Sequence, residues 1–375
     1  MTSVKIQQAT DSKGLDQFLK FPFRIYNGNP NWVPHLLVER KDFFNPSKNP
    51  FFEHAEVKNF MAFEDDEPAG RISAIINHRH NEFHEDNVGF FGFFECVNNQ
   101  QTANALYDKA ASVLRENGMT SMRGPCNFST NDEIGFLVEG HDSPPTIMNT
   151  YTPEYYLRLT EKYGFEKAMD VLGYYLDDTM EIPERVYRIF DRLIKREGLV
   201  IRPVDKKNLE EEVEKVKEIY NKAWEKNWGF VPLTDKEIEH MAADFKLILD
   251  PEIALFVEIN GKPIGFSLSL PNINEVLIKL NGRLFPFGIF KLLYNMKIAR
   301  TIKGIRTIIL GLLPEYRGKG YDNLLYLETV TRGLKRGYKW AEMGWILETN
   351  DRMIKGLENI GGKIFRRYRL YEIDL

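Results

Sequence analysis

The strongest constraint on the fold is a weak internal repeat that divides the 375-residue chain into two similar halves. Residues 61–75 and 256–270 both read as a strand, a tight turn of Asp-Asp or Asn-Gly, and a second strand. Pro68 matches Pro263 at an offset of 195 residues. Landmarks that recur in the same order predict that the two halves share one architecture.

The repeat continues through a helix in each half. Residues 102–119 and 321–340 carry apolar side chains at helical spacing, and each pattern is stopped by a glycine. Their offset is 219, so the second half carries about 24 extra residues before its helix. Gly164 and Gly361 return to an offset of 197, which places about 22 extra residues of the first half within 123–150.

Each half therefore reads as a strand, a helical segment, a hairpin, a further strand, and then helices alternating with strands. Antiparallel hairpins combined with a βαβ crossover predict an α/β fold with a mixed sheet. The predicted domains are 1–180 and 181–375, with a linking helix after Pro183. The 26 Phe and 17 Tyr residues provide enough apolar surface for two cores.

The segment most informative about function is 307–330, where an apolar strand ends at Pro314 and a helix begins near Tyr321. Between them lies the sequence Arg-Gly-Lys-Gly at 317–320. Backbone N–H groups of such a turn and the N-terminus of the following helix together favour a phosphate or pyrophosphate. The dinucleotide pattern Gly-x-Gly-x-x-Gly fails at Asn323, and no phosphate-loop sequence Gly-x4-Gly-Lys-Ser/Thr is complete.

The loop resembles the acyl-CoA pyrophosphate loop of the GNAT acyltransferase superfamily, whose pattern is Arg/Gln-x-x-Gly-x-Gly/Ala. Residues 317–320 match this loop, whereas Asp322 replaces the usual small residue at its end. Residues 338–365 resemble the family's next segment, with Asn350 and Gly361 at the expected places. The first half resembles the same fold without the loop, so the chain is identified as a tandem member with a degenerate N-terminal half.

This resemblance implies that the second half binds acetyl-CoA or another acyl-CoA as a co-substrate and transfers the acyl group to an amine. The pantetheine arm would lie beside strand 307–313, and the backbone N–H of Leu312 or Leu313 would polarise the thioester carbonyl. The implied cofactor-binding residues are Leu312, Leu313, Arg317, Gly318, Lys319, Gly320, Tyr321 and Asn350. Residues 275–339 carry 13 basic and 4 acidic side chains, which agrees with an anionic cofactor or, alternatively, with a solvated basic surface.

The catalytic groups are less clearly indicated. The position at which many family members carry a tyrosine general acid is Leu357. Glu348, just before Asn350, is predicted to accept the proton of the amine, or else to cap or salt-bridge the following helix. Leu313 is the predicted oxyanion donor. Leu357 and Asp322 favour the alternative that the protein is a non-catalytic binder of acyl-CoA or a metabolite.

The polar insertion 123–136 is the predicted acceptor site, for an amine of a small molecule or peptide. Its candidate substrate-binding residues are Asn127, Ser129, Asn131 and Asp132. An ordinary long surface loop is the alternative, although long loops in compact domains are often functional. No metal is expected, because the three histidines within 78–84 do not share one face of a strand. Two cysteines exclude a disulfide framework and a four-cysteine zinc site.

The sequence predicts a cytoplasmic protein, since its N-terminus lacks the apolar core of a signal peptide and its apolar runs are short. A formal charge of −4 argues against a nucleic-acid partner. Residues 284–303 are basic, amphipathic and aromatic. They predict a packed helix or, alternatively, a membrane-surface acyl or aminoacyl transferase that acts on lipid or wall precursors. The oligomeric state stays open.

Overall fold

The computed structural model describes residues 4–180 and 182–375. It divides into two compact units, each of which is described by itself. Unit 1 comprises Met1–Asp170, Leu277–Gly288 and Arg367–Leu375, and unit 2 comprises Val171–Val276 and Ile289–Arg366. Residues 1–3 of the N-terminal segment and residue 181, the predicted start of the second domain, lie outside the described residues.

The sheet of unit 1 has the strand order β1-β2-β3-β4-β5-β13. Neighbouring strands are antiparallel except for the parallel pair β4–β5. A further short strand, β6, pairs with β13. The strands are β1 (Val4–Gln8), β2 (Ala55–Glu64), β3 (Glu67–Asn77), β4 (Val88–Cys96), β5 (Ser121–Gly124), β6 (Phe136–Glu139) and β13 (Lys363–Asp374), whose residues from 367 onward belong to unit 1.

The sheet of unit 2 repeats this order with β8-β9-β10-β11-β12-β7. Again one pair, β11–β12, is parallel and the other pairs are antiparallel. The strands are β8 (Leu199–Pro203), β9 (Ala254–Ile259), β10 (Lys262–Pro271), β11 (Gly304–Leu312), β12 (Trp340–Leu347) and β7 (Glu166–Asp177), whose residues from 171 onward belong to unit 2. The common order confirms the predicted repeat and the predicted mixed sheet.

The two units exchange their last strands. β7 follows the last helix of unit 1 but pairs with β12 of unit 2, where Leu176 is opposite Ala341. β13 ends the chain but pairs with β5 of unit 1, where Tyr371 is opposite Gly124. The single boundary that the sequence predicts after residue 180 does not describe this exchange. Hydrophobic patterning indicates a strand but not its pairing partner.

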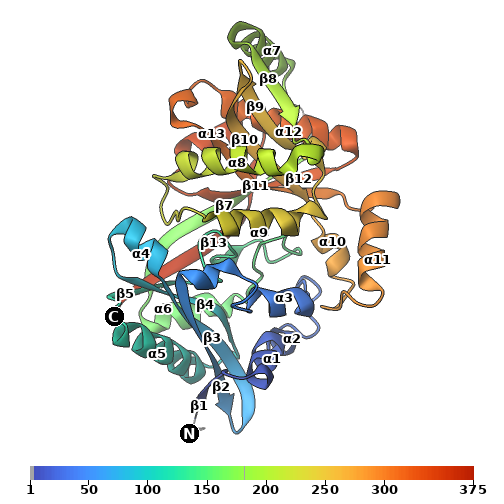
Figure 1. Ribbon diagram of the computed structural model, residues 1–375. Coiled ribbons are helices and arrows are strands. Elements are labelled where there is room, and N and C mark those ends of the chain that lie inside the picture. Colours follow the sequence, from blue (N-terminus) through green and yellow to red (C-terminus); the bar gives the residue numbers. More distant parts are fainter. Residues whose placement is uncertain (1–3, 181) are drawn as a thin grey trace. The chain divides into compact units, whose positions relative to one another are not determined.

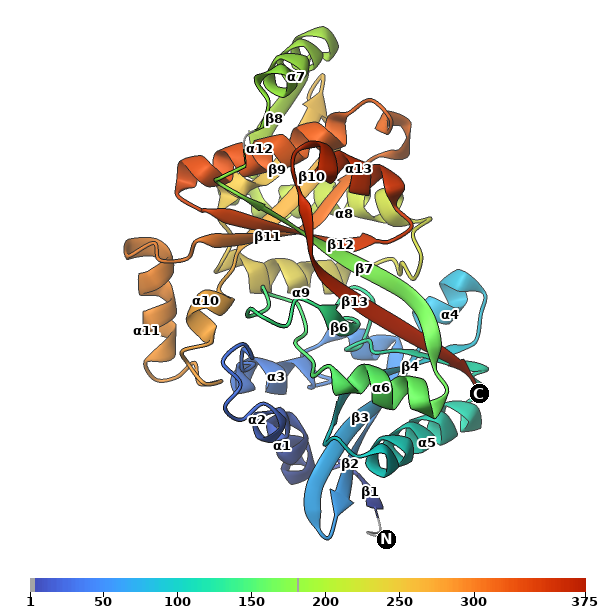
Figure 2. The ribbon, with the colours of Figure 1, turned by 180° about the vertical axis from the view of Figure 1, so that it is seen from behind.

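Helices cover these sheets (Figures 1 and 2). In unit 1 the helices are α1 (Ser12–Lys20), α2 (Pro22–Ile25), α3 (Leu37–Phe43), α4 (His78–His84), α5 (Gln100–Glu116) and α6 (Tyr155–Tyr163). In unit 2 they are α7 (Glu184–Glu197), α8 (Leu209–Trp224), α9 (Asp235–Lys246), α12 (Tyr321–Arg336) and α13 (Asp351–Asn359). The short helices α10 (Asn274–Leu277) and α11 (Gly288–Leu293) lie in the segment between β10 and β11.

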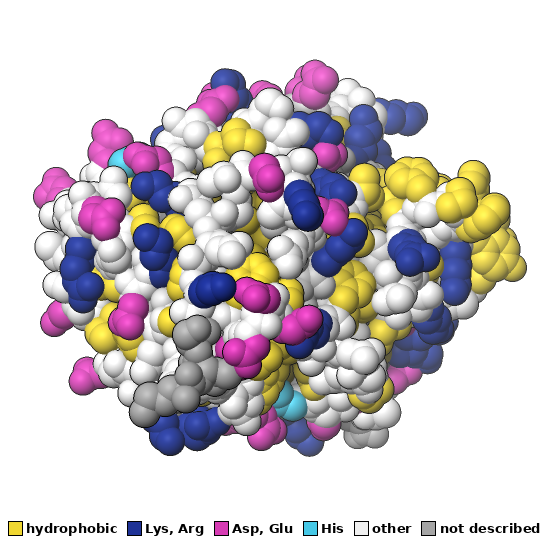
Figure 3. Space-filling model, turned by 90° about the horizontal axis from the view of Figure 1, so that it is seen from below, with side chains coloured by type: hydrophobic (Ala, Val, Ile, Leu, Met, Phe, Trp, Pro, Cys, Tyr) yellow, Lys and Arg dark blue, Asp and Glu magenta, His cyan; other side chains and the backbone are white. Residues whose placement is uncertain are grey.

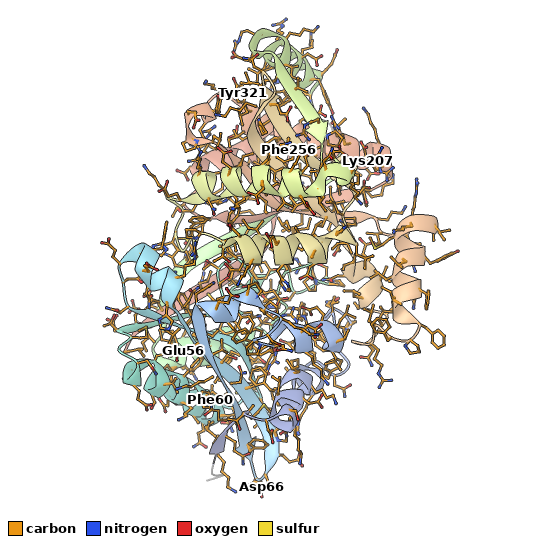
Figure 4. The ribbon with its side chains drawn as sticks, viewed as in Figure 1. Glu56, Phe60, Asp66, Lys207, Phe256 and Tyr321 are labelled. Carbon is orange, nitrogen blue, oxygen red and sulfur yellow. The ribbon has the colours of Figure 1, made fainter. Side chains whose placement is uncertain are left out.

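Helices α8 and α12 lie on opposite faces of the unit 2 sheet. A Cβ atom on Gly311 would lie 2.3 Å from the Trp224 ring of α8, so only glycine lets this helix approach β11 so closely. The next residue, Leu312, packs with Tyr321 and Leu324 of α12. Adjacent residues of a strand point to opposite faces, which places the two helices on either side. Figure 4 labels Tyr321 in this unit, together with Phe256 of β9.

Local predictions about turns and insertions are confirmed. Asn260 and Gly261 have φ angles of 51° and 75°, and Asp65 and Asp66 have 47° and 65°, as expected of two-residue hairpin turns. The extra residues of the second half form the segment between β10 and β11. Those of the first half lie between β5 and α6, around β6. The linking helix after Pro183 is α7.

Candidate functional site

The candidate site of unit 2 begins where β11 and β12 separate. Their parallel ladder runs from Gly304 opposite Trp340 to Thr307 opposite Met343 and ends there. On its other edge β11 stays paired with β10 as far as Leu312. Within the described residues, the last residues of β11 therefore have one edge without a strand beside it. Such an edge can accept an extended ligand as an added strand.

The two predicted oxyanion donors differ in this arrangement. The backbone N–H of Leu313 donates to the carbonyl oxygen of Ile264 at 2.9 Å, so it is already used. Hydrogen-bonding direction alternates along a strand, so the N–H of Leu312 points to the opposite edge, where the β12 ladder has ended. Both leucine side chains are buried. Leu312 is therefore the better placed donor of the two.

A glycine loop joins β11 to α12, as the sequence predicts. Gly318 and Gly320 have φ angles of 81° and 83°, the left-handed region that glycine adopts without strain. Gly320 is the N-cap of the 16-residue helix α12, and its lack of a side chain leaves the helix N-terminus open. Tyr321 is fully buried in the core, so that only its backbone can face a ligand. The N-terminus of α12 adds a partial positive charge to the loop.

A cavity of about 480 Å³ opens at this loop and reaches α13. Helices α12 and α13 approach each other closely there, because a Cβ atom on Gly356 would lie 2.4 Å from Oδ1 of Asn323. The cavity combines two basic side chains of α13 with open backbone at the glycines. Its lining residues are Gly318, Gly320, Asp322, Asn323, Asp351, Arg352, Lys355, Gly356 and Asn359.

Asp322, which departs from the family pattern, is paired with a cation. Its Oδ2 atom lies 2.9 Å from Nη2 of Arg352 on α13. The Asp322 side chain is 15% exposed. A carboxylate beside a bound phosphate is unfavourable, but an adjacent guanidinium offsets its charge. Sequence reasoning missed Arg352 and Lys355, although their place on the helix after Asn350 follows from the same resemblance.

The two cations of the loop itself are held differently. The Arg317 guanidinium donates to the carbonyl oxygen of Leu312 at 3.3 Å and to that of Ala223. Burial and the nearby Arg352 charge lower the Arg317 pKa. Lys319 is exposed, with Nζ 5.3 Å from the centre of the Tyr316 ring. Arg317 thus fastens the loop to α8, while Lys319 remains accessible to an anion.

The segment after β12 contains the remaining predicted residues. Asn350 is the N-cap of α13, and its side chain accepts a hydrogen bond from the N–H of Met353 at 3.3 Å. Glu348 is half-buried in the turn between β12 and α13. Leu357 is fully buried among the core residues of α13 and the sheet. Asn350 is therefore the N-cap of α13, and the role of Glu348 stays a prediction.

The corresponding helix N-terminus of unit 1 is arranged in a way that disfavours a bound anion. Asn99 caps α5, and its side chain accepts from the N–H of Gln101 at 2.9 Å. The Glu64 carboxylate accepts hydrogen bonds from the Asn99 side chain, at 2.9 Å, and from Thr102. A protein carboxylate thus occupies the N-terminal region of α5, where a phosphate would otherwise be favoured.

The predicted acceptor residues lie together in the loop between β5 and β6 of unit 1, and they make hydrogen bonds within that loop and to β4. Ser129 Oγ donates to Asp132 Oδ2 at 2.8 Å, and the N–H of Asn131 donates to Ser129 Oγ at 3.1 Å. Asn127 accepts from the N–H of Phe93 at 2.7 Å and donates to Glu133 at 3.0 Å. These contacts order the loop.

Glu133 joins this loop to α3 in a buried ionic cluster that the sequence did not indicate. Arg40 Nη2 lies 2.5 Å from Glu133 Oε1, and His35 Nδ1 lies 4.0 Å from the same oxygen. Burial alone would raise the pKa of Glu133, but the Arg40 charge and hydrogen bonds from Asn127 and Arg40 lower it to about 2. Burial and the Arg40 charge lower the His35 pKa to about 3.

The histidines near the end of β3 are not arranged as a metal site. β3 ends at Asn77, so His78, His80 and His84 lie on α4 and not on a strand. His80 is buried and its ring packs against that of His84, with a centroid distance of 4.4 Å. Among residues 4–180 and 182–375, no group of three or more His, Cys, Asp or Glu side chains could hold a metal ion.

The fold and the glycine loop together define the class of protein: a tandem GCN5-related N-acetyltransferase (GNAT) fold. Two solved structures align with nearly the whole chain. The GCN5-related glucosamine N-acetyltransferase region of a fungal multi-domain GH3 beta-N-acetylglucosaminidase covers 100% of this chain and 38% of that chain, with a TM-score of 0.58 and 13% identity. The alignment with the tandem GNAT protein from the clavulanic acid biosynthesis pathway covers 99% of this chain and 98% of that chain, with a TM-score of 0.56 and 12% identity.

More specifically, the chain belongs to the protein family that includes the bacterial ceramide synthase of Caulobacter vibrioides (strain NA1000 / CB15N) and protein YghO of Escherichia coli (strain K12). The first is 36% identical over 366 residues, which are 96% of this chain and 94% of the relative. The second is 33% identical over 363 residues, 96% and 92% of the two chains. No family model matches the chain.

Proposed function

We propose that the protein is an acyl-CoA-dependent N-acyltransferase whose acyl-CoA site lies in unit 2. One observation carries the proposal: the open edge of β11 leads directly to a glycine loop, a helix N-terminus and a cavity with basic side chains. An extended thiol arm suits the strand edge, and a pyrophosphate suits the loop. Lys319 and Lys355 are available to its phosphates, while Arg352 offsets the charge of Asp322.

We further propose that the acyl group is a fatty acyl chain and that the acceptor is a long-chain amino alcohol. The support is the relative named as a bacterial ceramide synthase, because a ceramide is the N-acyl derivative of such a base. The proposed acceptor falls within the class of amines that the sequence predicts. The proposed acyl group is long, whereas acetyl-CoA is the first co-substrate that the sequence resemblance implies. It also agrees with the alternative of a transferase that acts on lipids.

In the proposed reaction the amine nitrogen forms a bond to the thioester carbon and the carbon–sulfur bond breaks. The N–H of Leu312 donates to the carbonyl oxygen as negative charge develops there. Glu348 accepts the proton that the ammonium group loses before its attack, directly or through water. The thiolate of CoA leaves with the electron pair of the carbon–sulfur bond, stabilised by the positive charge of the loop. It takes up, through water, the second proton that the nitrogen loses as the amide forms.

Calorimetric titration with a long-chain acyl-CoA tests the binding site through Gly318→Val combined with Gly320→Val. Valine at these left-handed positions strains the loop and obstructs close approach of the phosphates, so we expect at least about a tenfold loss of affinity. Gly337→Val is the matched control. Gly337 has a φ of 94° and ends the same helix, with no atom within 4 Å of the added Cβ. Equal affinity in a folded double variant and in the control would refute the site.

Release of free thiol from acyl-CoA in the presence of a sphingoid base tests catalysis. We expect turnover with long acyl chains, and little with acetyl-CoA. Glu348→Gln should lower turnover while leaving acyl-CoA affinity unchanged. Unchanged turnover would assign Glu348 a structural role.

A non-catalytic acyl-CoA binder is the second candidate, because the buried Leu357 cannot act as the usual acid. Tight binding of acyl-CoA without thiol release, for any amine supplied, would favour this candidate.

A further inference from the structure

The segment between β10 and β11 exposes a row of large apolar side chains. Phe290 lies on α11, and Tyr294 and Ile298 lie on the π-helical turn (Tyr294–Ile298) that continues it. Their exposed fractions are 69%, 55% and 71%. A spacing of four residues puts all three on one side of this helix. Phe285 and Phe287, just before α11 in the chain, are 64% and 79% exposed.

The opposite side of this helix is packed. Leu292 and Ile302 are buried. Asn295 donates to the carbonyl oxygen of Lys291 at 2.7 Å and accepts from the Thr301 hydroxyl at 2.7 Å. The prediction of a packed helix is thus satisfied by one side only. Packing within the protein therefore does not explain why the exposed side carries large apolar side chains.

The segment that carries this row has charged side chains of one sign only. Residues 283–303 contain five basic side chains and no acidic one. Four of the basic residues, Lys291, Lys297, Arg300 and Lys303, are exposed on α11 or just after it. In Figure 3 hydrophobic side chains gather at the right-hand edge, over the α11 segment, with Lys and Arg beside them. Aromatic and aliphatic side chains beside cations are what an interfacial helix presents to an anionic bilayer.

We propose that the exposed row Phe290, Tyr294 and Ile298, with its surrounding Lys and Arg residues, docks the protein on the surface of an anionic lipid bilayer. The apolar side chains enter the headgroup region and the cations contact lipid phosphates. Within the described residues, no helix is long and apolar enough to cross a membrane. The proposed docking is peripheral. It does not depend on the proposed reaction, although it would bring the enzyme to substrates with long hydrocarbon chains.

Co-sedimentation of the full chain with vesicles tests this docking. The vesicles are phosphatidylcholine alone and phosphatidylcholine with about one third phosphatidylglycerol. We expect binding to the anionic vesicles, weaker binding to the neutral ones, and a decrease with added salt. Phe290→Ser/Tyr294→Ser/Ile298→Ser should reduce the partition coefficient for anionic vesicles at least about tenfold. Lys291→Gln/Lys297→Gln/Arg300→Gln should reduce binding and flatten its salt dependence.

The matched control is Tyr187→Ser/Ile189→Ser/Val200→Ser, which removes three exposed apolar side chains elsewhere in unit 2. It should bind vesicles as the unchanged protein does, and all variants should keep their melting temperature and acyl-CoA affinity. Absence of wild-type binding to either vesicle, or equal binding by the Phe290 triple variant, would overturn the proposal. A dimer in sedimentation velocity that this variant dissociates, without an effect on vesicle binding, would assign the row to a second copy instead.

Discussion

At the scale of single residues, the neighbour of Asp322 decides whether the loop motif is compatible with a bound anion. The sequence places a carboxylate where the acyl-CoA loop pattern has a small residue. The structure adds Arg352, whose guanidinium lies 2.9 Å from that carboxylate. The pair presents little net charge, so the motif is compatible with an anion even though its last position differs.

This pairing predicts non-additive effects on acyl-CoA binding. Arg352→Gln leaves the Asp322 charge uncompensated next to the proposed pyrophosphate, so we expect about a tenfold loss of affinity, or about 1.4 kcal/mol. Asp322→Asn alone should have little effect. The double variant should recover most of the loss, and calorimetry on all four proteins measures the coupling. Strictly additive effects would mean that Arg352 contacts the ligand independently of Asp322.

The Arg40–Glu133 pair predicts how the stability of unit 1 depends on pH. The Glu133 pKa is about 2 in the folded protein, below its ordinary value of 4.5. A depressed carboxyl pKa stabilises the fold above pH 4.5, and this contribution disappears as the pH falls from 4.5 toward 2. It amounts to at most about 3 kcal/mol at neutral pH.

Urea unfolding at a series of pH values measures this contribution. Glu133→Gln should destabilise the protein at neutral pH and make its stability less sensitive to acid. Glu139→Gln is the control, because Glu139 makes a solvent-exposed ion pair with Arg367 and its loss should cost less than about 1 kcal/mol. Acidification could instead lower the free energy of unfolding equally in both variants and in the unchanged protein. Glu133 would then not be the group that makes stability depend on pH.

At the scale of elements, equivalent helices of the two halves have different N-termini. α12 begins at an open glycine, whereas α5 begins at Asn99 with the Glu64 carboxylate hydrogen-bonded to its cap. A helix dipole attracts an anion only where no protein carboxylate has taken the position. The first half keeps the fold and lacks the features of the second half that suit an anion.

We therefore expect one acyl-CoA site per chain, in unit 2. Calorimetric titration of the full chain should give a stoichiometry of one. The Gly318→Val/Gly320→Val variant should abolish this single binding event and uncover no second one. Two equivalents bound per chain, or one that survives the double variant, would place a site in unit 1.

At the scale of the whole molecule, the last strand of each half of the chain pairs in the unit formed mainly by the other half. Tyr371 of β13 is almost fully buried in the core of unit 1, and Arg369 forms an ion pair with Asp170 at 2.8 Å. The first half of the chain thus lacks a core strand until the last residues are present. The contacts of β13 with the rest of unit 1 join residues that are far apart in the sequence.

Removal of residues 367–375 should consequently destabilise unit 1, although it leaves the first 170 residues unchanged. Loss of the β13 pairing and of the buried Tyr371 ring costs several side-chain contacts, of which an aromatic core residue alone contributes about 3–5 kcal/mol. Limited proteolysis should then cleave within unit 1 first. Equal resistance of the truncated and full chains would show that β13 is dispensable there.

The sequence by itself determined the repeat, the two hairpins, the helices α5, α7 and α12, and the place of the glycine loop. These features depend on local spacing: Asn260-Gly261 specifies a turn, and the glycines at 318 and 320 specify a left-handed loop before a helix. The family resemblance then followed from the order of these elements.

Only the tertiary structure decided which groups meet. It paired Asp322 with Arg352, used the Leu313 N–H in the sheet, set Glu64 against the cap of α5, and joined Arg40 to a carboxylate 93 residues away. It also gave β7 and β13 to opposite units. Side-chain periodicity reports which face of an element is buried, whereas the partner across that face is set by packing and hydrogen bonding between distant segments.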